Sequence, residues 1–294
     1  MFRAVLRLAR PAVLLMTAAV VATACVGAAG ATNPSSDPTI GPTQVDRDEV
    51  VIRVDWDGGF VPPSVQLGRL PLVLVTADGR VISQGPQLAI YPGPLMPNLQ
   101  VRTLAAEGLQ DLLDLAQEQG LLEDAHYDLL TIADATTTIL SITIDGRTTR
   151  VSAYALAEGL EAGSSTDAEA DAGRAALRDY LDALTAIPDS AFVDESSPYA
   201  FTSLRLFASP AVVVPGSEFP GEQPPIDWPL RELGAAGDEV GNGQLGFRCQ
   251  VLTGDDLSAA LPLLADANQL SVFRSGDELW TLVPRPLLPG EEGC

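Results

Sequence analysis

One stretch of the chain decides its fold class: TILSITIDGRTTRVSAY, residues 138–154. Apolar and polar side chains alternate on both sides of Asp145-Gly146, which is the period of a half-buried strand. Asp-Gly between two such runs predicts a tight hairpin, because both turn positions favour a positive φ. A hairpin requires antiparallel pairing, so we expect this part of the chain to form an antiparallel sheet.

Two further hairpins are predicted from the same signal, one around Asp78-Gly79 and one around Ser275-Gly276-Asp277. Their strands are expected at residues 72–75 with 81–82, and at 270–273 with 279–283. Single strands are expected at 49–54, 201–207 and 247–252. Residues 90–97 carry several prolines, which remove backbone donors, so neither helix nor strand is expected there.

Three helices are predicted from apolar side chains at helical spacing. The first is expected to begin with Thr103 as its N-cap and to end at Gly120. The second opens with a capping box formed by Thr166 and Glu169, and the third spans 255–267. The apolar stripes of the first two helices are Leu109, Leu112, Leu113 and Ala116, and Leu177, Tyr180, Leu181 and Leu184.

Together these elements predict an α+β fold, in which antiparallel hairpins have helices packed on one face. A small C-terminal αβ unit, braced by a disulfide, is expected to follow. The predicted parts are a signal peptide at 1–24, a flexible tether at 25–47, an α+β domain at 48–209, a Pro/Gly-rich linker or loop at 210–245, and the αβ unit at 246–294. Trp228 is the expected packing anchor of the Pro/Gly-rich segment.

The first 24 residues are typical of an export signal, because three arginines precede an apolar run that ends in small residues. Cys25 follows Ala22-Thr23-Ala24, which resembles a bacterial lipobox. Cleavage there would make Cys25 the lipidated N-terminus, carrying acyl chains such as palmitate, on the extracytoplasmic face of the cell membrane. Three alternatives stay open: plain secretion after cleavage at the same bond, cleavage after Ala31, and an uncleaved membrane anchor formed by residues 11–31.

Cysteine parity predicts one disulfide. Lipidation of Cys25, or its removal with the signal peptide, leaves Cys249 and Cys294, an even pair in an oxidising compartment. The bridge would close a loop of about 46 residues and stabilise the fold by about 4 kcal/mol on the chain-entropy model. Cleavage before Cys25 without acylation would instead leave an odd thiol.

The composition excludes several functions. All 17 basic residues are arginine, so no lysine is available for a Walker A phosphate site, a Schiff base or a serine–lysine dyad. Removing residues 1–24 leaves 14 arginines against 39 carboxylates, a formal charge of −25. A chain this acidic repels phosphate backbones, so nucleic acid is not expected as a partner. No cofactor and no metal site is predicted from the sequence.

Few residues offer catalytic chemistry. The sole histidine, His126, is expected to lie just past a helix end and to satisfy a backbone carbonyl. No Gly-x-Ser-x-Gly turn is present to display a serine nucleophile. Acids occur in close pairs, Asp55 with Asp57 and Asp124 with Asp128, so a carboxylate-dependent hydrolase of the cell envelope is an alternative function.

Two sets of motifs resemble a family of secreted bacterial lipoproteins that has no assigned activity. The first set comprises residues 58–63, the Asp78-Gly79 hairpin, 90–94 and 134–138; the second comprises Arg248-Cys249, 285–289 and Cys294. These motifs are turns, prolines and cysteines. The resemblance therefore implies an architecture and a disulfide, and it implies no catalytic residue.

The sequence favours a non-enzymatic binding module over an enzyme. Its candidate binding residues are three aromatic side chains beside prolines and glycines: Trp56, Phe60 and Tyr91. Such residues anchor interfaces, although packing in the hydrophobic core is the competing interpretation. The expected partners are the membrane, through the lipid, and another envelope protein. Inhibition of an extracellular enzyme through the Pro92-Gly93-Pro94 loop is a further alternative.

Overall fold

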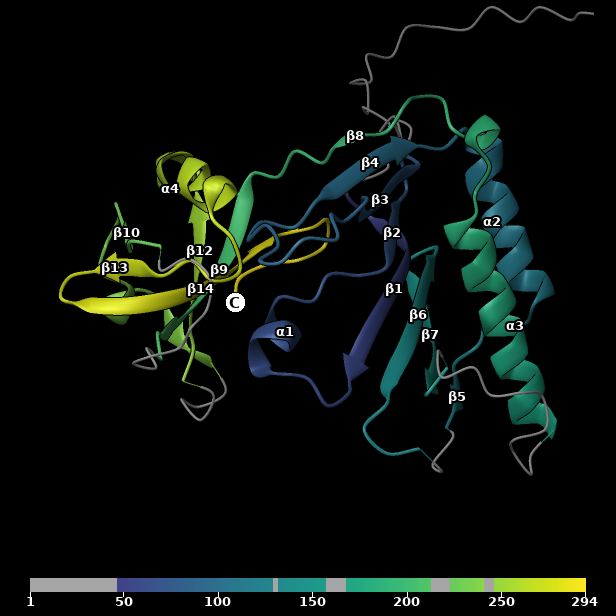
Figure 1. Ribbon diagram of the computed structural model, residues 1–294. Helices are drawn as coiled ribbons and strands as arrows, with labels where there is room; N and C mark the ends of the chain where they lie inside the picture. The colour runs from purple at the N-terminus through teal and green to yellow at the C-terminus, as the bar shows by residue number, and fades with distance from the viewer. Residues whose placement is uncertain (1–46, 129–131, 157–167, 213–222, 241–245) are drawn as a thin grey trace, which may run out of the picture. The chain divides into compact units, whose positions relative to one another are not determined.

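A computed structural model describes residues 47–128, 132–156, 168–212, 223–240 and 246–294 (Figure 1). The predicted signal peptide, the lipidation site at Cys25, nearly all of the tether and the capping residue Thr166 lie outside the described residues. Within the described residues, no helix is both long and apolar enough to cross a membrane.

The first sheet has eight strands in the order β5-β7-β6-β1-β2-β3-β4-β8. Every pair in it is antiparallel except β5 with β7, which is parallel. The strands are β1 (Val50–Gly58), β2 (Val73–Thr76), β3 (Arg80–Gln84), β4 (Leu99–Thr103), β5 (Ala125–Tyr127), β6 (Thr136–Ile144), β7 (Arg147–Tyr154) and β8 (Ser197–Pro198).

The second sheet has six strands in the order β10-β13-β14-β9-β12-β11, and only β10 with β13 is parallel. Its strands are β9 (Ser203–Pro210), β10 (Ile226–Asp227), β11 (Asp238–Glu239), β12 (Arg248–Thr253), β13 (Phe273–Ser275) and β14 (Glu278–Pro286). The fold is therefore mixed α+β with two mostly antiparallel sheets, as the Asp-Gly hairpins predict.

Across the residues that the structure describes, four α-helices accompany the sheets: α1 (Pro63–Leu67), α2 (Ala106–Glu118), α3 (Ala168–Thr185) and α4 (Gly254–Asp266). The predicted N-cap at Thr103 is wrong, because Thr103 ends β4 and Ala105 precedes α2 without a side-chain cap. The sequence also gave no expectation of α1, whose single turn begins at Pro63. A proline at the first helical position needs no hydrogen-bond partner, so it can open a helix as well as break one.

The hairpin at 138–154 forms as expected. Asp145 and Gly146 have φ of 51° and 74°, and Ile144 faces Arg147 across the turn. At Asp78-Gly79 only the glycine has a positive φ, 84°, and the turn joins β2 to β3. The third hairpin joins β13 to β14, but β13 begins at Phe273, where the expected strand ends.

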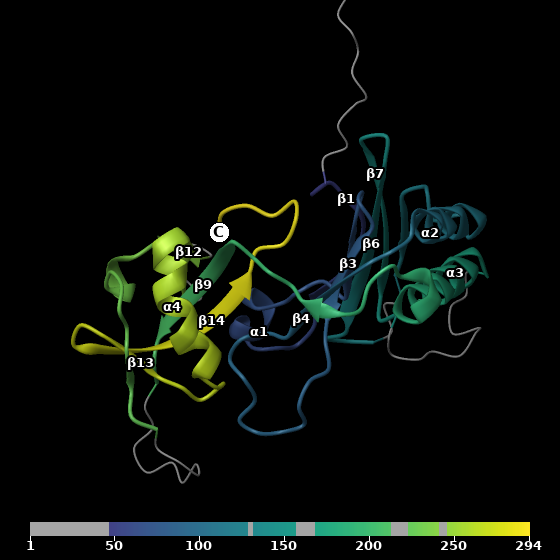
Figure 2. The ribbon, with the colours of Figure 1, turned by 90° about the horizontal axis from the view of Figure 1, so that it is seen from above.

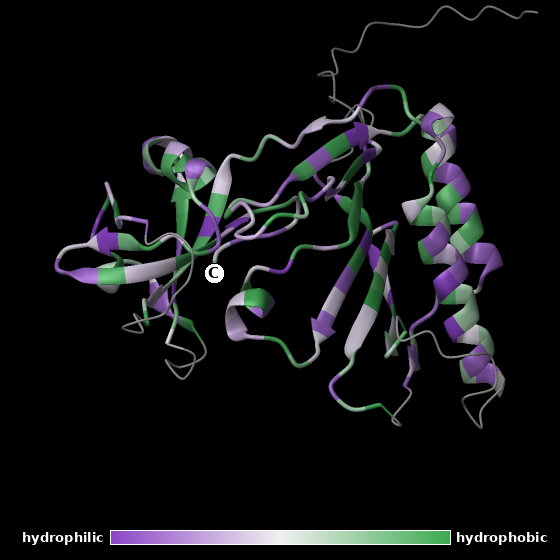
Figure 3. Ribbon diagram, viewed as in Figure 1, coloured by the Kyte–Doolittle hydropathy of each residue, from purple (hydrophilic) through white to green (hydrophobic). Residues whose placement is uncertain are grey.

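A hydrophobic core joins α2 and α3 to the first sheet. Both helices contribute their predicted stripes, since Leu112, Ala116, Leu177, Tyr180 and Leu184 are all buried in one cluster with strand residues. The strand residues in that cluster include Ile52, Val54, Leu140, Ile142, Val151 and Ala153. The two helices lie side by side (Figures 1 and 2), and hydrophilic and hydrophobic residues alternate along them (Figure 3). This pattern is that of amphipathic helices.

A second core surrounds α4 and the second sheet. Trp228 is buried in it, as predicted, and its ring meets Phe273 edge to face at 6.1 Å. The second sheet draws strands from all three predicted parts: β9 begins within 48–209, β10 and β11 come from 210–245, and β12 lies in 246–294. The division at 210–245 stays a prediction, but the Pro/Gly-rich segment contributes strands to this sheet.

Candidate functional site

The loop between β3 and β4, residues 85–98, carries three exposed apolar side chains, Leu88, Ile90 and Tyr91. We call it the Tyr91 loop. Tyr91 is 68% exposed, and no charged residue lies between Arg80 and Arg102. The centres of protein interfaces are depleted of charge and enriched in aromatic residues. The Tyr91 loop therefore has the composition of an interface rather than of an ordinary loop in an acidic protein.

The base of the Tyr91 loop is fixed by backbone hydrogen bonds. Gly85 donates to the carbonyl of Asn98 at 2.7 Å, which closes the loop beside β3 and β4. The amide of Gln269 donates to the carbonyl of Gly93 at 2.9 Å, and Leu95 donates to Ala267 at 3.0 Å. A loop that is already held in place loses less conformational entropy when it binds.

A second exposed apolar surface lies at the end of β1, and we call it the Phe60 turn (residues 56–65). Phe60 is 89% exposed and Trp56 is also exposed, so the interpretation that these residues and Tyr91 pack in the core is wrong. The backbone of the turn is held by a hydrogen bond from Phe60 to the carbonyl of Asp134 at 3.2 Å. The guanidinium of Arg69 donates to the carbonyl of Gly58 at 2.7 Å.

The two apolar surfaces have different neighbours. The Phe60 turn contacts Asp134 and Arg69, whereas the Tyr91 loop contacts Ala267 and Gln269. We therefore describe the three predicted binding residues as two separate surfaces, with Trp56 and Phe60 on one and Tyr91 on the other.

Three of the four paired acids have local structural partners. Asp55 accepts two hydrogen bonds from the guanidinium of Arg53, at 2.7 and 2.9 Å. Asp57 accepts from the amide of Gly58 at 2.7 Å, and Asp124 accepts from the amide of Arg150 at 2.7 Å. Each of these carboxylates is engaged by an arginine side chain or a backbone amide, so the contacts give no specific support to paired-acid hydrolysis.

The fourth acid, Asp128, belongs to a polar cluster around His126. The ring Nδ1 of His126 lies 2.6 Å from the Ser152 hydroxyl, and Nε2 lies 2.8 Å from an Asp128 carboxylate oxygen. His126 follows α2, but it lies in β5 and faces Ser152 of β7. The expectation that it satisfies a backbone carbonyl is wrong, because both ring nitrogens contact side chains. β5 has only three residues, which is too short to leave a periodic signal from which its parallel pairing with β7 could be predicted.

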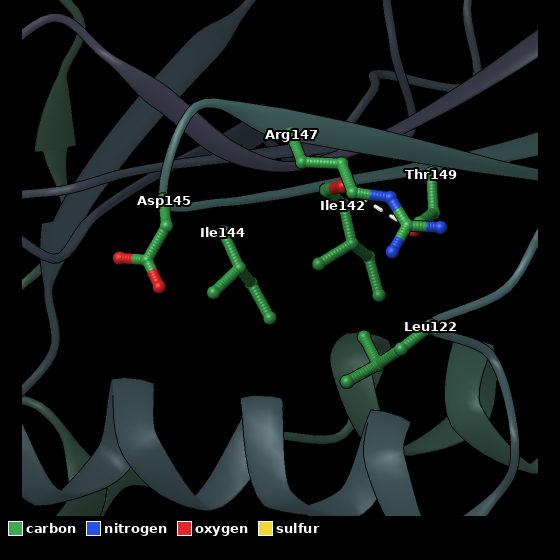
Figure 4. A pocket seen from close by; sticks show the side chains of 6 residues that line it. All are labelled: Leu122, Ile142, Ile144, Asp145, Arg147 and Thr149. Atoms are coloured by element: carbon green, nitrogen blue, oxygen red, sulfur yellow. Dashed lines mark hydrogen bonds between the residues drawn. The ribbon is translucent and has the colours of Figure 1, made fainter.

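A pocket of about 330 Å³ lies beside the β6–β7 hairpin (Figure 4). Ile142 and Ile144 point from β6 toward a neighbouring helix, and Leu122 faces them (Figure 4). Asp145 and Arg147 add opposite charges near the turn, and Thr149 completes the lining. The volume is at the lower end of small-molecule sites, so only a small ligand would fit.

The most buried ion pairs of the described residues surround Glu291, near the C-terminus. Its carboxylate, whose side chain is 9% exposed, accepts from Arg285 at 2.6 and 2.7 Å and from Arg53 at 2.8 Å. Burial by itself would raise the pKa of Glu291, but the hydrogen bonds and charges of Arg285 and Arg53 outweigh burial and lower the pKa to about 2. This cluster ties the C-terminal segment to β1 of the first sheet and β14 of the second.

The predicted disulfide is present between Cys249 and Cys294, whose Cα atoms are 5.9 Å apart. Arg205 adds hydrogen bonds to the carbonyls of Gly293 at 2.8 Å and Glu292 at 3.2 Å. Burial and the neighbouring charge of Arg285 lower the pKa of Arg205. A covalent bond, an ion-pair cluster and backbone contacts thus hold the C-terminal segment in place.

In the part of the chain that the structure describes, no three His, Cys, Asp or Glu side chains are grouped to hold a metal ion. No protein-family model matches the chain, and no curated protein matches it. The function must therefore be inferred from the surfaces and clusters described above.

Proposed function

We propose that the chain is an extracytoplasmic lipoprotein, anchored in the cell membrane through Cys25, whose folded part binds another envelope protein through the Tyr91 loop. An extracellular enzyme that is inhibited by this loop would be one such partner. The observation that carries the proposal is the exposure of Leu88, Ile90 and Tyr91 on an uncharged loop whose base is fixed.

Physical chemistry favours a protein partner for this loop. Tyrosine in an interface contributes a large apolar area and a hydroxyl that can still be hydrogen-bonded. Exposed apolar side chains that are contiguous along a chain are costly to leave in water, so a partner surface that covers them gains about 25 cal/mol per Å² of apolar area. The acidic residues elsewhere would keep the unbound protein soluble.

The signal-like sequence of residues 1–25 and the disulfide support the extracytoplasmic part of the proposal. The disulfide is a bond of oxidising compartments. Two or more acyl chains on Cys25 would make attachment effectively permanent, because each buried CH₂ contributes about 0.8 kcal/mol. We further propose that α2 and α3 pack on one face of the first sheet.

Site-specific photo-crosslinking in membranes of the producing cell tests the binding surface. A photoreactive phenylalanine replaces Tyr91 in one variant and Val193 in a matched control, since both side chains are 68% exposed. We expect one discrete protein adduct from position 91 and none from position 193, and we expect Leu88→Ser to reduce the adduct at least fivefold. The same adducts from both positions would reject the Tyr91 loop as the binding surface.

The anchor has its own test, because the loop could bind a partner in a protein that is not lipidated. The intact mass of the membrane-extracted chain is expected to equal that of residues 25–294 plus acyl chains, and Cys25→Ser is expected to release the protein from the membrane. An unmodified N-terminal peptide would contradict the anchor and leave the crosslinking result to stand by itself.

A further inference from the structure

The polar cluster around His126 lies on the sheet face that is opposite the helical core. Side chains alternate between the two faces of a strand. Val151 and Ala153 of β7 belong to the core cluster that contains the helix residues, so Ser152 between them points to the other face. His126 is paired with Ser152 in register, and Asp128 follows two residues later on the same side.

We propose that Ser152, His126 and Asp128 form a nucleophilic site that cleaves small carboxylic esters. This activity goes beyond the proposed binding function and does not rest on it. The contacts of 2.6 Å from Ser152 Oγ to Nδ1 and 2.8 Å from Nε2 to Asp128 are within the range expected for a nucleophile, a base and an orienting acid.

The tautomer explains how the three groups act together. When the imidazole carries its proton on Nε2, that N–H donates to Asp128, and Nδ1 is left to accept the hydroxyl proton of Ser152. Asp128 thereby holds the ring in the orientation in which Nδ1 faces the serine. Here Nδ1 faces the serine and Nε2 faces the acid, which is the reverse of the arrangement in the best-known serine hydrolases. The chemistry requires only that one ring nitrogen accepts the serine proton and that the other donates a hydrogen bond to the acid.

Each step of the proposed reaction balances. Ser152 Oγ forms a bond to the ester carbonyl carbon while its proton moves to Nδ1. The bond from that carbon to the alcohol oxygen then breaks, and the alcohol takes the proton from Nδ1. Water attacks the acyl-serine, its proton passes through Nδ1 to Ser152 Oγ, and the carboxylic acid leaves.

Arg150 adds positive charge beside the serine. It lies two residues before Ser152 on the same face of β7, about 6.7 Å along the strand. Its amide is held by Asp124 at 2.7 Å, and no described residue hydrogen-bonds or ion-pairs with its guanidinium. A guanidinium at this position favours the oxyanion that develops when the serine attacks.

The openness of the site defines its substrate class. The side chain of His126 is 65% exposed, so the site is an open surface that water reaches. An open surface gives little binding energy, and it accepts a small acyl group at the end of a larger molecule as readily as a free ester. We therefore expect slow turnover. With an activated ester, whose leaving group departs easily, acylation of the serine is expected to be faster than its hydrolysis, so that the acyl-serine accumulates.

The experiment uses the full-length chain with two probes, a fluorophosphonate reporter and 4-nitrophenyl acetate. We expect one reporter per chain on Ser152 by peptide mass, and a burst of one equivalent of 4-nitrophenolate. His126→Gln is expected to slow labelling by about 100-fold or more, which is a usual contribution of a general base. Asp128→Asn is expected to slow it about tenfold, and Arg150→Gln about threefold.

Matched controls make each outcome decisive. Ser141→Ala removes a serine from the same face of the first sheet, where it is paired with Arg150, and is expected to label like the wild type. Ser152→Ala is expected to abolish both the label and the burst. A burst that persists in Ser152→Ala, labelling of Ser141 to the same extent, or equal labelling in folded His126→Gln would overturn the proposal. Crosslinking at position 91 is independent of these variants.

Discussion

Two polar clusters share one face of the first sheet and differ in what covers them. Arg53 lies on this face because its neighbours Ile52 and Val54 are in the core, and it belongs to the cluster around Glu291. His126 and Ser152 lie on the same face of the sheet, on the side of β6 that is away from β1. In register, Ile139 of β6 lies between Asp55 of β1 and Ser152 of β7. The C-terminal segment covers the first cluster, whereas the second is open to water.

The difference in cover decides what each cluster contributes. Around Glu291 the charges are removed from water, and each must be paired to offset the cost of burial. Around His126 the groups remain hydrated, so their contacts add little stability and their atoms are accessible to a reacting molecule. The covered cluster around Glu291 thus stabilises the fold, whereas the groups of the open cluster around His126 are accessible to a reacting molecule.

The largest effect is expected from breaking the covered cluster. Glu291→Ala leaves the buried guanidinium group of Arg285 without its carboxylate and leaves Arg53 paired with Asp55 alone. Removing one partner of a buried ion pair costs about 3–5 kcal/mol. Urea unfolding followed by circular dichroism measures the loss. Glu292→Ala is the control, because Glu292 is the next residue along the chain and is exposed. This substitution is expected to change the unfolding free energy by less than about 0.5 kcal/mol.

A somewhat smaller effect is expected from removing the disulfide that holds the C-terminal segment in place. Cys294→Ser, made together with Cys249→Ser to avoid a free thiol, is expected to lower the unfolding free energy by about 2–4 kcal/mol. Fluorophosphonate labelling of Ser152 should stay within twofold of wild type. If the double variant unfolds at the wild-type urea concentration, the disulfide does not brace the C-terminal segment.

Acid is expected to weaken the cluster around Glu291. The pKa of Glu291 is lowered from its ordinary 4.5 to about 2 in the folded chain, so its carboxylate stabilises the fold above the unfolded pKa. That contribution is lost as the pH falls from about 4.5 toward 2. The wild type is therefore expected to lose stability more steeply than Glu291→Gln over this window. Parallel curves from thermal melts at each pH would show that Glu291 does not contribute.

The smallest effect is expected from the open cluster. His126→Gln and Asp128→Asn should change the unfolding free energy by less than about 1 kcal/mol each, since exposed ion pairs contribute little. A loss of 3 kcal/mol or more from either variant, estimated on the scale of buried pairs, would show that the His126 cluster is structural and that its contacts are not available for catalysis. The measurement is the same urea titration.

Patterns within short stretches of the sequence predicted those parts of the fold that depend on neighbouring residues. Asp145-Gly146 predicted the hairpin, and the spacing of Leu177, Tyr180 and Leu184 predicted the buried face of α3. Cysteine parity gave the Cys249–Cys294 bond. In each case the prediction depends on a few residues that are close in the sequence or on the number of cysteines.

The candidate sites depend on contacts that the sequence does not encode locally. His126 and Ser152 meet only because β5 pairs in parallel with β7, and the three residues of β5 are too few to leave a periodic signal. Glu291 resembles every other acid in the sequence until Arg53 and Arg285 surround it. Tyr91 and Phe60 could equally have been core residues, because hydrophobicity alone does not tell which apolar side chains remain exposed.

The most direct test of the difference between the two clusters is the titration of the Glu291 carboxyl carbon by ¹³C NMR. If this carboxylate is removed from water and paired with Arg285 and Arg53, its titration midpoint is expected at about pH 2. A midpoint near the ordinary 4.5 would contradict the account, because the charge around Glu291 would then be as well hydrated as that around His126.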